Sequence, residues 1–231
     1  MFSVGTTNES VRVEWIEKTL KKIPAGLTLL DAGAGESQFK KFCGHLKYIA
    51  QDFGQYHGEG EVGLHTGTWD NSKLDIVSDI TAIPLPDASV DAIMCTEVFE
   101  HIPDAVAAIR EFSRLVKPGG YLLLTAPFAS ITHFAPYHFA TGFNRYFYEK
   151  HLPDFGFAIE DLQLNGNYFE FVAQETRRVK QMASRYSGVK LSFFQKSVQH
   201  LWLKVLEGLS EKDKGSSELL SYGVHVFARK K

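Results

Sequence analysis

The sequence is poor in cysteine, carries no strong excess of charge and contains no long apolar run. Two cysteines, Cys43 and Cys95, are too few for a disulfide framework and lack metal-ligand spacing, so we expect buried thiols. A formal net charge of −2 argues against general nucleic-acid binding. No apolar run approaches the roughly 18 residues of a membrane span, and residues 1–15 lack a secretory-signal pattern. We therefore expect a cytoplasmic protein without a transmembrane segment.

The composition is that of a globular protein, with 44% hydrophobic and 23% charged residues in a chain of 231. Several apolar runs are too short for helices and are typical of strands buried on both faces. They occupy residues 27–31, 48–52, 74–79, 90–96 and 121–127. A helical pattern over 104–120, ended by Pro118 and Gly119, separates the last two runs. This alternation of strand and helix predicts a parallel sheet covered by helices.

Both ends of the chain add further elements to this pattern. Residues 9–22 form an amphipathic helix with Asn8 or Ser10 near its N-cap. Alternating apolar positions predict two late strands, "FAIEDLQL" and "YGVHVFARK", of which the second adds at an edge of the sheet. Two periodic segments, roughly 168–187 and 192–209, lie between these strands. We expect them to form a helical insertion.

The stretch "LLDAGAGESQF" places two glycines, Gly33 and Gly35, between the first buried strand and an expected helix. A dinucleotide fingerprint needs a third glycine where this chain has Gln38, and a phosphate loop needs a lysine followed by serine or threonine. Asp31 and Glu36 bracket the turn, so a phosphate is repelled and a cation is favoured. S-adenosylmethionine, with its ammonium and its sulfonium, meets this requirement.

With this turn and four more segments in register, the chain resembles the class I S-adenosylmethionine-dependent methyltransferases. The acidic residue and Gly-x-Gly of the family correspond to "DAGAG", and "YIAQDF" is similar to the strand whose acid, here Asp52, holds the ribose hydroxyls. "SDITAIPLPDASVDAI" resembles the adenine segment, "MCTEVFEHI" the strand end next to the cofactor, and "LVKPGGYLLLTAP" the fifth strand. The resemblance implies these cofactor-binding residues: Asp31, Gly33, Gly35, Asp52, Asp79, Ile80, Thr96 and Glu97. Asp79 could instead cap the following turn.

The resemblance covers about residues 10–130 and the last strand, and it implies the fold. We expect an α/β, Rossmann-like, mostly parallel seven-stranded sheet with an antiparallel last edge strand and helices on both faces. Residues 1–231 would then form a single methyltransferase domain, with 168–210 as the helical insertion between the last two strands.

Three histidines are candidates for a general base that deprotonates an acceptor hydroxyl: His138, His133 and, as third choice, His101. His133 and His138 lie in the aromatic-rich segment 126–152, where the family often builds its acceptor pocket. His101 lies one turn after Glu97 if a helix begins there. Each could equally be a packed or surface histidine. We find no ligand cluster that would indicate a metal.

O-methylation of a small molecule is the expected reaction, and the acceptor class stays open. A looser resemblance, in residues 138–152 and 166–178, to methyltransferases of surface-polysaccharide synthesis implies a sugar or polysaccharide precursor. A non-catalytic S-adenosylmethionine-binding module remains an alternative, and an NAD-dependent oxidoreductase is disfavoured by Gln38.

The basic residues of the helical insertion form a solvated face or contact an anionic acceptor, a partner or a membrane. Its apolar stripe is buried against the parent domain or in a homodimer.

Overall fold

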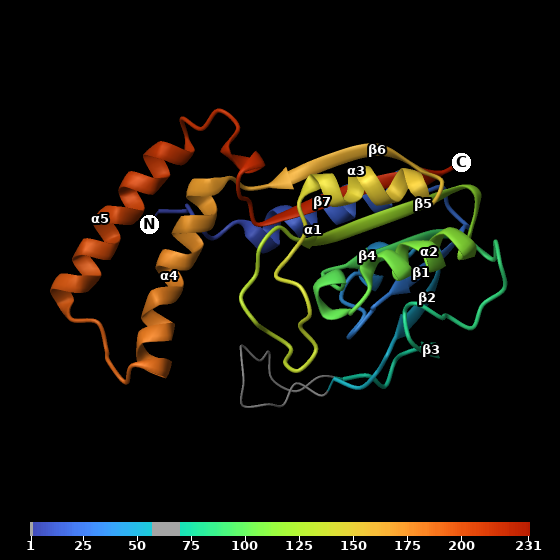
Figure 1. The fold of residues 1–231 in the computed structure, drawn as a ribbon, viewed down its shortest axis with the longest axis horizontal. Helices are drawn as coiled ribbons and strands as arrows, with labels where there is room; N and C mark the ends of the chain where they lie inside the picture. The colour runs from blue at the N-terminus through green and yellow to red at the C-terminus, as the bar shows by residue number, and fades with distance from the viewer. Residues whose placement is uncertain (1, 57–69) are drawn as a thin grey trace.

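The computed structural model of the chain describes residues 2–56 and 70–231. Its described residues form one seven-stranded sheet in the order β3-β2-β1-β4-β5-β7-β6 (Figure 1). The strands are β1 (Thr28–Ala32), β2 (Lys47–Asp52), β3 (Ile76–Val77), β4 (Val90–Thr96), β5 (Val116–Pro127), β6 (Phe157–Asn165) and β7 (Gly223–Lys230). The pairs among β1 to β5 are parallel, and β7 alone runs antiparallel to its neighbours. The expected Rossmann-like fold is confirmed.

The position of β7 differs from the expectation, because this strand is not at the edge of the sheet. It pairs with β5 on one side and β6 on the other, and β6 forms the edge. The burial of the two strands gives the reason. Residues 223–228 of β7 are buried on both faces, whereas β6 carries Glu160, Asp161 and Gln163, whose polar side chains suit an exposed edge.

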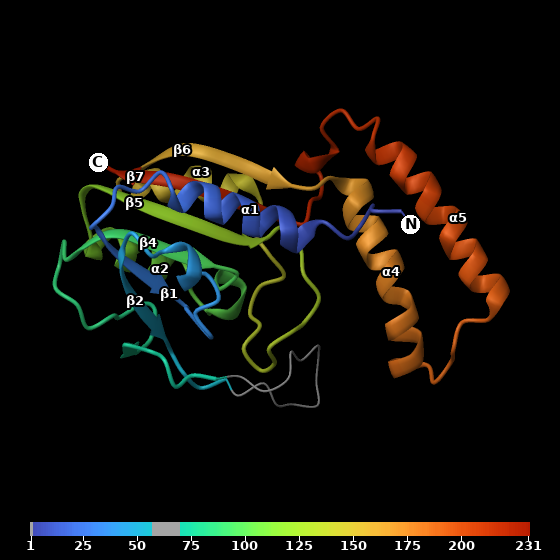
Figure 2. The same cartoon turned by 180° about the vertical axis from the view of Figure 1, so that it is seen from behind.

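Helices cover both faces of the sheet. α1 (Asn8–Leu20) lies on one face, and α2 (Ala105–Leu115) and α3 (Arg145–Asp154) lie on the other (Figures 1 and 2). Alternate strand residues serve the two faces, as the strand period of two requires: Leu29 packs with α1, and Leu30 belongs to the core beneath α2 and α3. Each face therefore has its own buried core.

Local structure after β1 and β5 departs from the expected pattern. No α-helix follows the glycine turn in the described residues; the segment between β1 and β2 holds only a 3-10 turn, η1 (Lys40–Phe42). Ser37 adopts a left-handed conformation there, with φ of 58°, which interrupts a regular helix. The aromatic-rich segment after β5, expected as a pocket wall, ends in α3, which was not anticipated.

The insertion between β6 and β7 forms two helices, α4 (Tyr168–Tyr186) and α5 (Phe193–Ser210), which stand beside the end of the sheet (Figure 1). The N-terminal segment ties to α4, since the Arg177 guanidinium donates hydrogen bonds to the carbonyls of Val4 and Phe2. α5 has its own N-terminal capping box, Ser192 with Gln195. Much of the apolar surface of α5 is nevertheless exposed, including Phe193 at 87% and Phe194 at 75%.

None of the helices in the described part combines the length and the apolar composition needed to cross a membrane.

The core beneath α2 should depend strongly on Phe112, which is fully buried. Replacing Phe112 by Ala removes an aromatic side chain from a close-packed core, so we expect the free energy of unfolding to fall by about 3 to 5 kcal/mol. Arg110→Ala, on the exposed side of the same helix, should change it by less than about 1 kcal/mol. Chemical denaturation of both variants measures the difference, and equal losses would contradict this assignment of the core.

Candidate active site

The turn after β1 lies against the end of β2. The amides of Gly33 and Ala34 both donate to the carbonyl of Gln51 at 2.8 Å, and the amide of Gly35 donates to Asp52 Oδ2 at 3.0 Å. Gly33 has φ of +79°, and a Cβ there would stand 2.4 Å from Val98 Cγ2. The backbone conformation and the close approach of Val98 both require glycine at this position.

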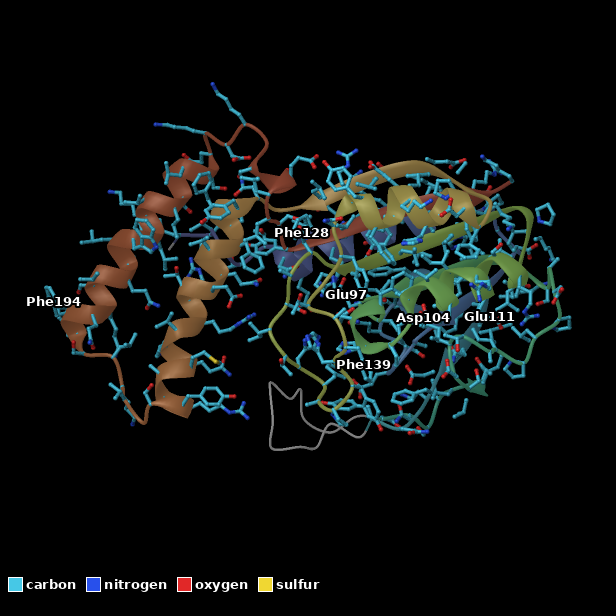
Figure 3. All side chains as sticks on the ribbon, in the orientation of Figure 1. Glu97, Asp104, Glu111, Phe128, Phe139 and Phe194 are labelled. Atoms are coloured by element: carbon cyan, nitrogen blue, oxygen red, sulfur yellow. The ribbon has the colours of Figure 1, made fainter. Side chains whose placement is uncertain are left out.

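A cavity of about 1020 Å³ opens at this turn, at the carboxyl ends of the parallel strands. This is where open α/β sheets bind ligands. Glu97, Phe128 and Phe139, labelled in Figure 3, lie at this end of the sheet, between its body and α4. Seven of the eight predicted cofactor-binding residues line the cavity: Gly33, Gly35, Asp52, Asp79, Ile80, Thr96 and Glu97.

Asp31, the eighth of these residues, is not part of the cavity wall and is only 2% exposed. The Tyr48 hydroxyl donates a hydrogen bond to its Oδ2, and Oδ1 has no hydrogen-bond partner among the described residues. Burial raises the pKa of Asp31 to about 7; the Tyr48 hydrogen bond opposes this rise, and the Asp52 carboxylate adds to it. Asp31 therefore lies behind the turn without contacting the cavity, and its carboxyl is fully charged only above about pH 7.

Two of the predicted carboxylates have protein partners as well. Asp79 Oδ1 accepts hydrogen bonds from the amide and the hydroxyl of Thr81, so this residue does cap the following turn while it lines the cavity. Asp52 Oδ1 accepts from the amide of Gly54. These bonds fix the orientation of both carboxylates at the cavity wall.

Glu97 makes an ion pair that sequence reasoning missed. Arg12 Nη1, from α1, donates to Glu97 Oε2 at 3.0 Å, and the hydroxyl of Thr125 donates to Oε1 at 2.9 Å. Arg12 and Glu97 are 85 residues apart, and no local pattern connects them. No α-helix begins at Glu97 either: a 3-10 turn, η2 (Phe99–His101), follows it, and Glu97 itself has φ of 55°.

The described part of the cavity wall is rich in negative charge. Its ionisable residues include two arginines, Arg12 and Arg178, and six acids: Glu9, Glu36, Asp52, Asp79, Glu97 and Asp104. A seventh acid, Glu100, is buried, and burial raises the pKa of its carboxyl well above the usual range, so it does not add to this charge. Such a wall disfavours a diphosphate and favours a cation, as the glycine turn alone suggested. Arg178 and Gln174 come from α4, so the insertion closes one side of the cavity.

The three candidate bases come together on one side of the same cavity. His101 and His133 line it, and His138 lies beside them, with His133 and His138 ring centroids 4.9 Å apart. Burial, reinforced by His133, lowers the pKa of His101 to about 3, and burial also lowers the pKa of His138. Sequence analysis found no metal-ligand cluster, yet these three side chains place one ring nitrogen each within 4.8 Å of one another.

A Rossmann-like sheet, a Gly-x-Gly turn after β1 and acids at the ends of β2 and β4 are the features of a class I methyltransferase. The match to known families agrees. Residues 30–124 match a family model described as a methyltransferase domain. The matched segment covers the glycine turn and most of the parallel strands, and over this part the chain is similar to that methyltransferase family.

Curated relatives match about half of the chain. Ubiquinone biosynthesis O-methyltransferase from Leptothrix cholodnii is 31% identical over 121 residues, 50% of this chain and 50% of the relative. The protein of the same name from Xanthomonas oryzae pv. oryzae is 40% identical over 124 residues, 50% of this chain and 48% of the relative. The chain thus spans about half the length of the curated relatives it matches.

Solved structures match almost the whole chain in fold. Phosphoethanolamine N-methyltransferase 2 from Haemonchus contortus, solved in complex with S-adenosyl-L-methionine, has a TM-score of 0.53 at 17% identity. The alignment covers 96% of this chain and 52% of that one. These structures show the fold, and the methyltransferase-domain match over residues 30–124 agrees with the expectation of S-adenosylmethionine as the cofactor.

The buried charge of Asp31 should affect stability in a pH-dependent way. Its pKa is higher in the folded chain than the value of 3.8 for an exposed aspartate, so its contribution to folding is fully present below pH 4 and is lost as the pH rises to about 7. We expect Asp31→Asn to remove that slope, with a gain at pH 8 on the order of 4 kcal/mol relative to the unsubstituted protein. Denaturation at pH 4, 6 and 8 measures it.

Asp87→Asn is the matched control for this measurement, because the Asp87 side chain is 81% exposed and its ion pair with Arg114, at 2.7 Å, lies at the surface, where it contributes little to folding. Its unfolding free energy should follow that of the unsubstituted protein across the same pH range. If Asp31→Asn and Asp87→Asn gave parallel pH curves, the buried charge of Asp31 would not oppose folding.

Proposed function

We propose that the chain is an S-adenosylmethionine-dependent O-methyltransferase. The observation that carries this proposal is the cavity at the strand ends, where the glycine turn, Asp52 and Asp79 meet the histidine cluster. One end of the cavity suits a cationic adenosyl donor, and the other end suits a hydroxyl acceptor. The named activity of the curated relatives, O-methyl transfer, supports the same reaction.

The protein has three tasks in such a reaction: holding the donor, orienting the acceptor and removing a proton. S-adenosylmethionine, when bound, supplies a methyl group on a sulfonium, so the acceptor C–O bond forms as the C–S bond breaks, leaving S-adenosylhomocysteine. Asp52 is oriented to accept hydrogen bonds from ribose hydroxyls, and the surrounding carboxylates compensate the cationic charge. The walls align the acceptor and exclude water.

A histidine of the cluster formed by His101, His133 and His138 takes the proton from the acceptor hydroxyl. His133 Nδ1 lies 2.9 Å from the carbonyl of Ile131, which accepts a hydrogen bond from Nδ1–H in the tautomer whose Nε2 carries a free lone pair. His133 also lines the cavity, whereas His138 lies behind it. His133 is therefore the first choice for a base in the metal-free protein, ahead of His138 and His101.

The acceptor is a small planar molecule that carries a hydroxyl group. Aromatic side chains line its side of the cavity: Phe53, Tyr56, Phe134, Tyr137 and Phe139. Flat aromatic walls stack on planar rings and also on sugar faces. The ubiquinone-biosynthesis names of the relatives favour a phenolic acceptor, and a sugar or polysaccharide precursor stays the second candidate.

The cytoplasmic location of the protein stays a prediction.

Methyl transfer is tested by incubating the protein with S-adenosylmethionine and two acceptor panels, hydroxylated aromatics and nucleotide sugars. We expect a product about 14 Da heavier in the aromatic panel, because one hydrogen is replaced by a methyl group. Gly33→Ala should abolish both cofactor binding and product, since its new Cβ would collide with Val98. Mass spectrometry and calorimetry with S-adenosylhomocysteine provide the two measurements.

Gly26→Ala is the matched control, because Gly26 also has a left-handed φ of +83° but a Cβ there meets nothing within 4 Å. Both variants carry the same kind of backbone strain, and only Gly33→Ala blocks the turn. Cofactor binding without any product would favour a non-catalytic binding module, and binding of NADH instead of the sulfonium compound would favour an oxidoreductase. Product only from nucleotide sugars would replace the phenolic acceptor by a sugar.

We infer further that the exposed face of α5 joins two copies of the chain as a homodimer. The exposed apolar residues of this helix include Phe193, Phe194, Val198, Leu201, Trp202, Val205 and Leu209. Contiguous apolar surface of this kind is rarely left in water by a monomeric protein. Figure 3 shows Phe194 on the side of α5 that points away from the sheet, where a second copy can reach it.

Phe194→Glu combined with Leu201→Glu should convert the dimer to a monomer, because both charges would be buried in the interface. Light scattering after size exclusion measures the mass. Lys204→Glu, also exposed on α5, introduces the same charge and should leave the dimer intact. A monomeric unsubstituted protein would contradict the inference.

A further inference from the structure

Three histidines from two separate segments meet on the cavity side of η2. His101 follows β4, and His133 and His138 come from the loop between β5 and α3. One ring nitrogen from each lies within 4.8 Å of the others, and all three side chains are partly buried. The His101 and His133 ring centroids are 4.6 Å apart. The three rings therefore form one cluster with its nitrogens close together.

Hydrogen bonds orient two of these rings as metal ligands are oriented in proteins. His101 Nδ1 lies 2.6 Å from the carbonyl of Tyr137, and His133 Nδ1 lies 2.9 Å from the carbonyl of Ile131. Each carbonyl accepts a hydrogen bond from the Nδ1–H of its histidine, and in this tautomer both Nε2 atoms carry a free lone pair. Metal-ligating histidines usually donate their second ring N–H to a backbone carbonyl or a carboxylate in this way.

A buried carboxylate lies among the free nitrogens. Glu100 is 1% exposed, and its Oε1 is 3.6 Å from His101 Nε2 and 3.7 Å from His133 Nε2. Its Oε2 has no hydrogen-bond partner in the described part of the chain, and neither has either ring nitrogen of His138. Buried polar atoms in native proteins are nearly always satisfied, so these unpartnered atoms indicate a missing partner.

We propose that His101, His133, His138 and Glu100 bind a divalent transition-metal ion at the acceptor end of the cavity. Three imidazole nitrogens and one carboxylate oxygen suit zinc or cobalt better than magnesium, which prefers oxygen ligands and water. Tetrahedral ligands around zinc stand roughly 3.4 Å apart, so small side-chain rotations close the site. His101 and His133 line the cavity, which gives the ion a path from solvent.

The chemical role of the ion rests on the proposed function, whereas the binding itself does not. A cation beside the acceptor hydroxyl lowers the pKa of that hydroxyl and stabilises the oxygen anion as it attacks the methyl group. The hydroxyl proton then passes to solvent or to a cavity carboxylate, since nitrogens bound to the ion cannot take it. The metal-bound and metal-free proteins thus deprotonate the acceptor by different groups.

The test is calorimetric titration of the tag-free, chelator-treated protein with Zn²⁺, Co²⁺ and Mg²⁺ separately. We expect one Zn²⁺ or Co²⁺ per chain, with weaker Mg²⁺ binding, and a visible absorption band from nitrogen-ligated Co²⁺. Loss of outer-shell partners alone costs about 10- to 100-fold in metal affinity, so His133→Ala with His138→Ala should weaken binding by more than about 100-fold. Glu100→Gln should change the Co²⁺ spectrum.

His200→Ala is the matched control, since His200 is exposed on α5 and stacks on Phe2 far along the chain from the cluster. It should leave Zn²⁺ affinity unchanged, and S-adenosylhomocysteine binding should persist in the double variant as evidence that it folds. Unchanged Zn²⁺ binding in the double variant, or none in the unsubstituted protein, overturns the proposal.

Assays of methyl transfer distinguish a failure of the proposed metal site from a failure of the proposed function. One bound Zn²⁺ without any product supports the metal site and contradicts the proposed acceptor class. Product formation that is indifferent to a chelator, in a protein that binds no Zn²⁺, supports the proposed function and overturns the metal site. Product formation that stops with the chelator and returns with Zn²⁺ or Co²⁺ supports both.

Discussion

The attachment of the first turn to the second strand is the constraint on which the site depends. Gly33, Ala34 and Gly35 all direct their amides to the end of β2, two to the Gln51 carbonyl and one to Asp52. This holds the backbone open for a ligand and fixes the Asp52 carboxylate toward the cavity. A side chain at Gly33 would meet Val98, so the same contact that shapes the turn also excludes every larger residue there.

Electrostatics divides the cavity into two ends. Around the turn, Asp31 lies buried behind the wall while Asp52 and Asp79 face the ligand, so the field is negative where a cationic donor is expected. At the other end, three histidine side chains and the buried Glu100 form a polar cluster beside aromatic side chains. The ion pair between Arg12 and Glu97 lies between the two ends and joins α1 to the end of β4.

Local patterns in the sequence were sufficient for the strands and the turn, because a run such as 90–96 is mostly apolar and the two glycines between the first strand and the next segment mark a turn by themselves. They were not sufficient where the decisive contact is distant. Burial of β7 between β5 and β6 depends on the whole sheet, and the Arg12–Glu97 pair joins residues with no common motif. The histidines were found singly from the sequence, but their convergence depends on how the loop after β5 folds back over η2.

The insertion is connected to the N-terminal segment as well as to the cavity. Arg177 donates to the carbonyls of Phe2 and Val4, Gly5 donates its amide to Glu170, and the next residue after Arg177 on α4, Arg178, reaches the cavity wall. The C-terminus, in contrast, lies at the opposite end of the sheet (Figure 1). A fluorescent label or fusion partner joined at the C-terminal end would therefore leave the acceptor side undisturbed, whereas one joined ahead of Phe2 would pull on the helix that walls it.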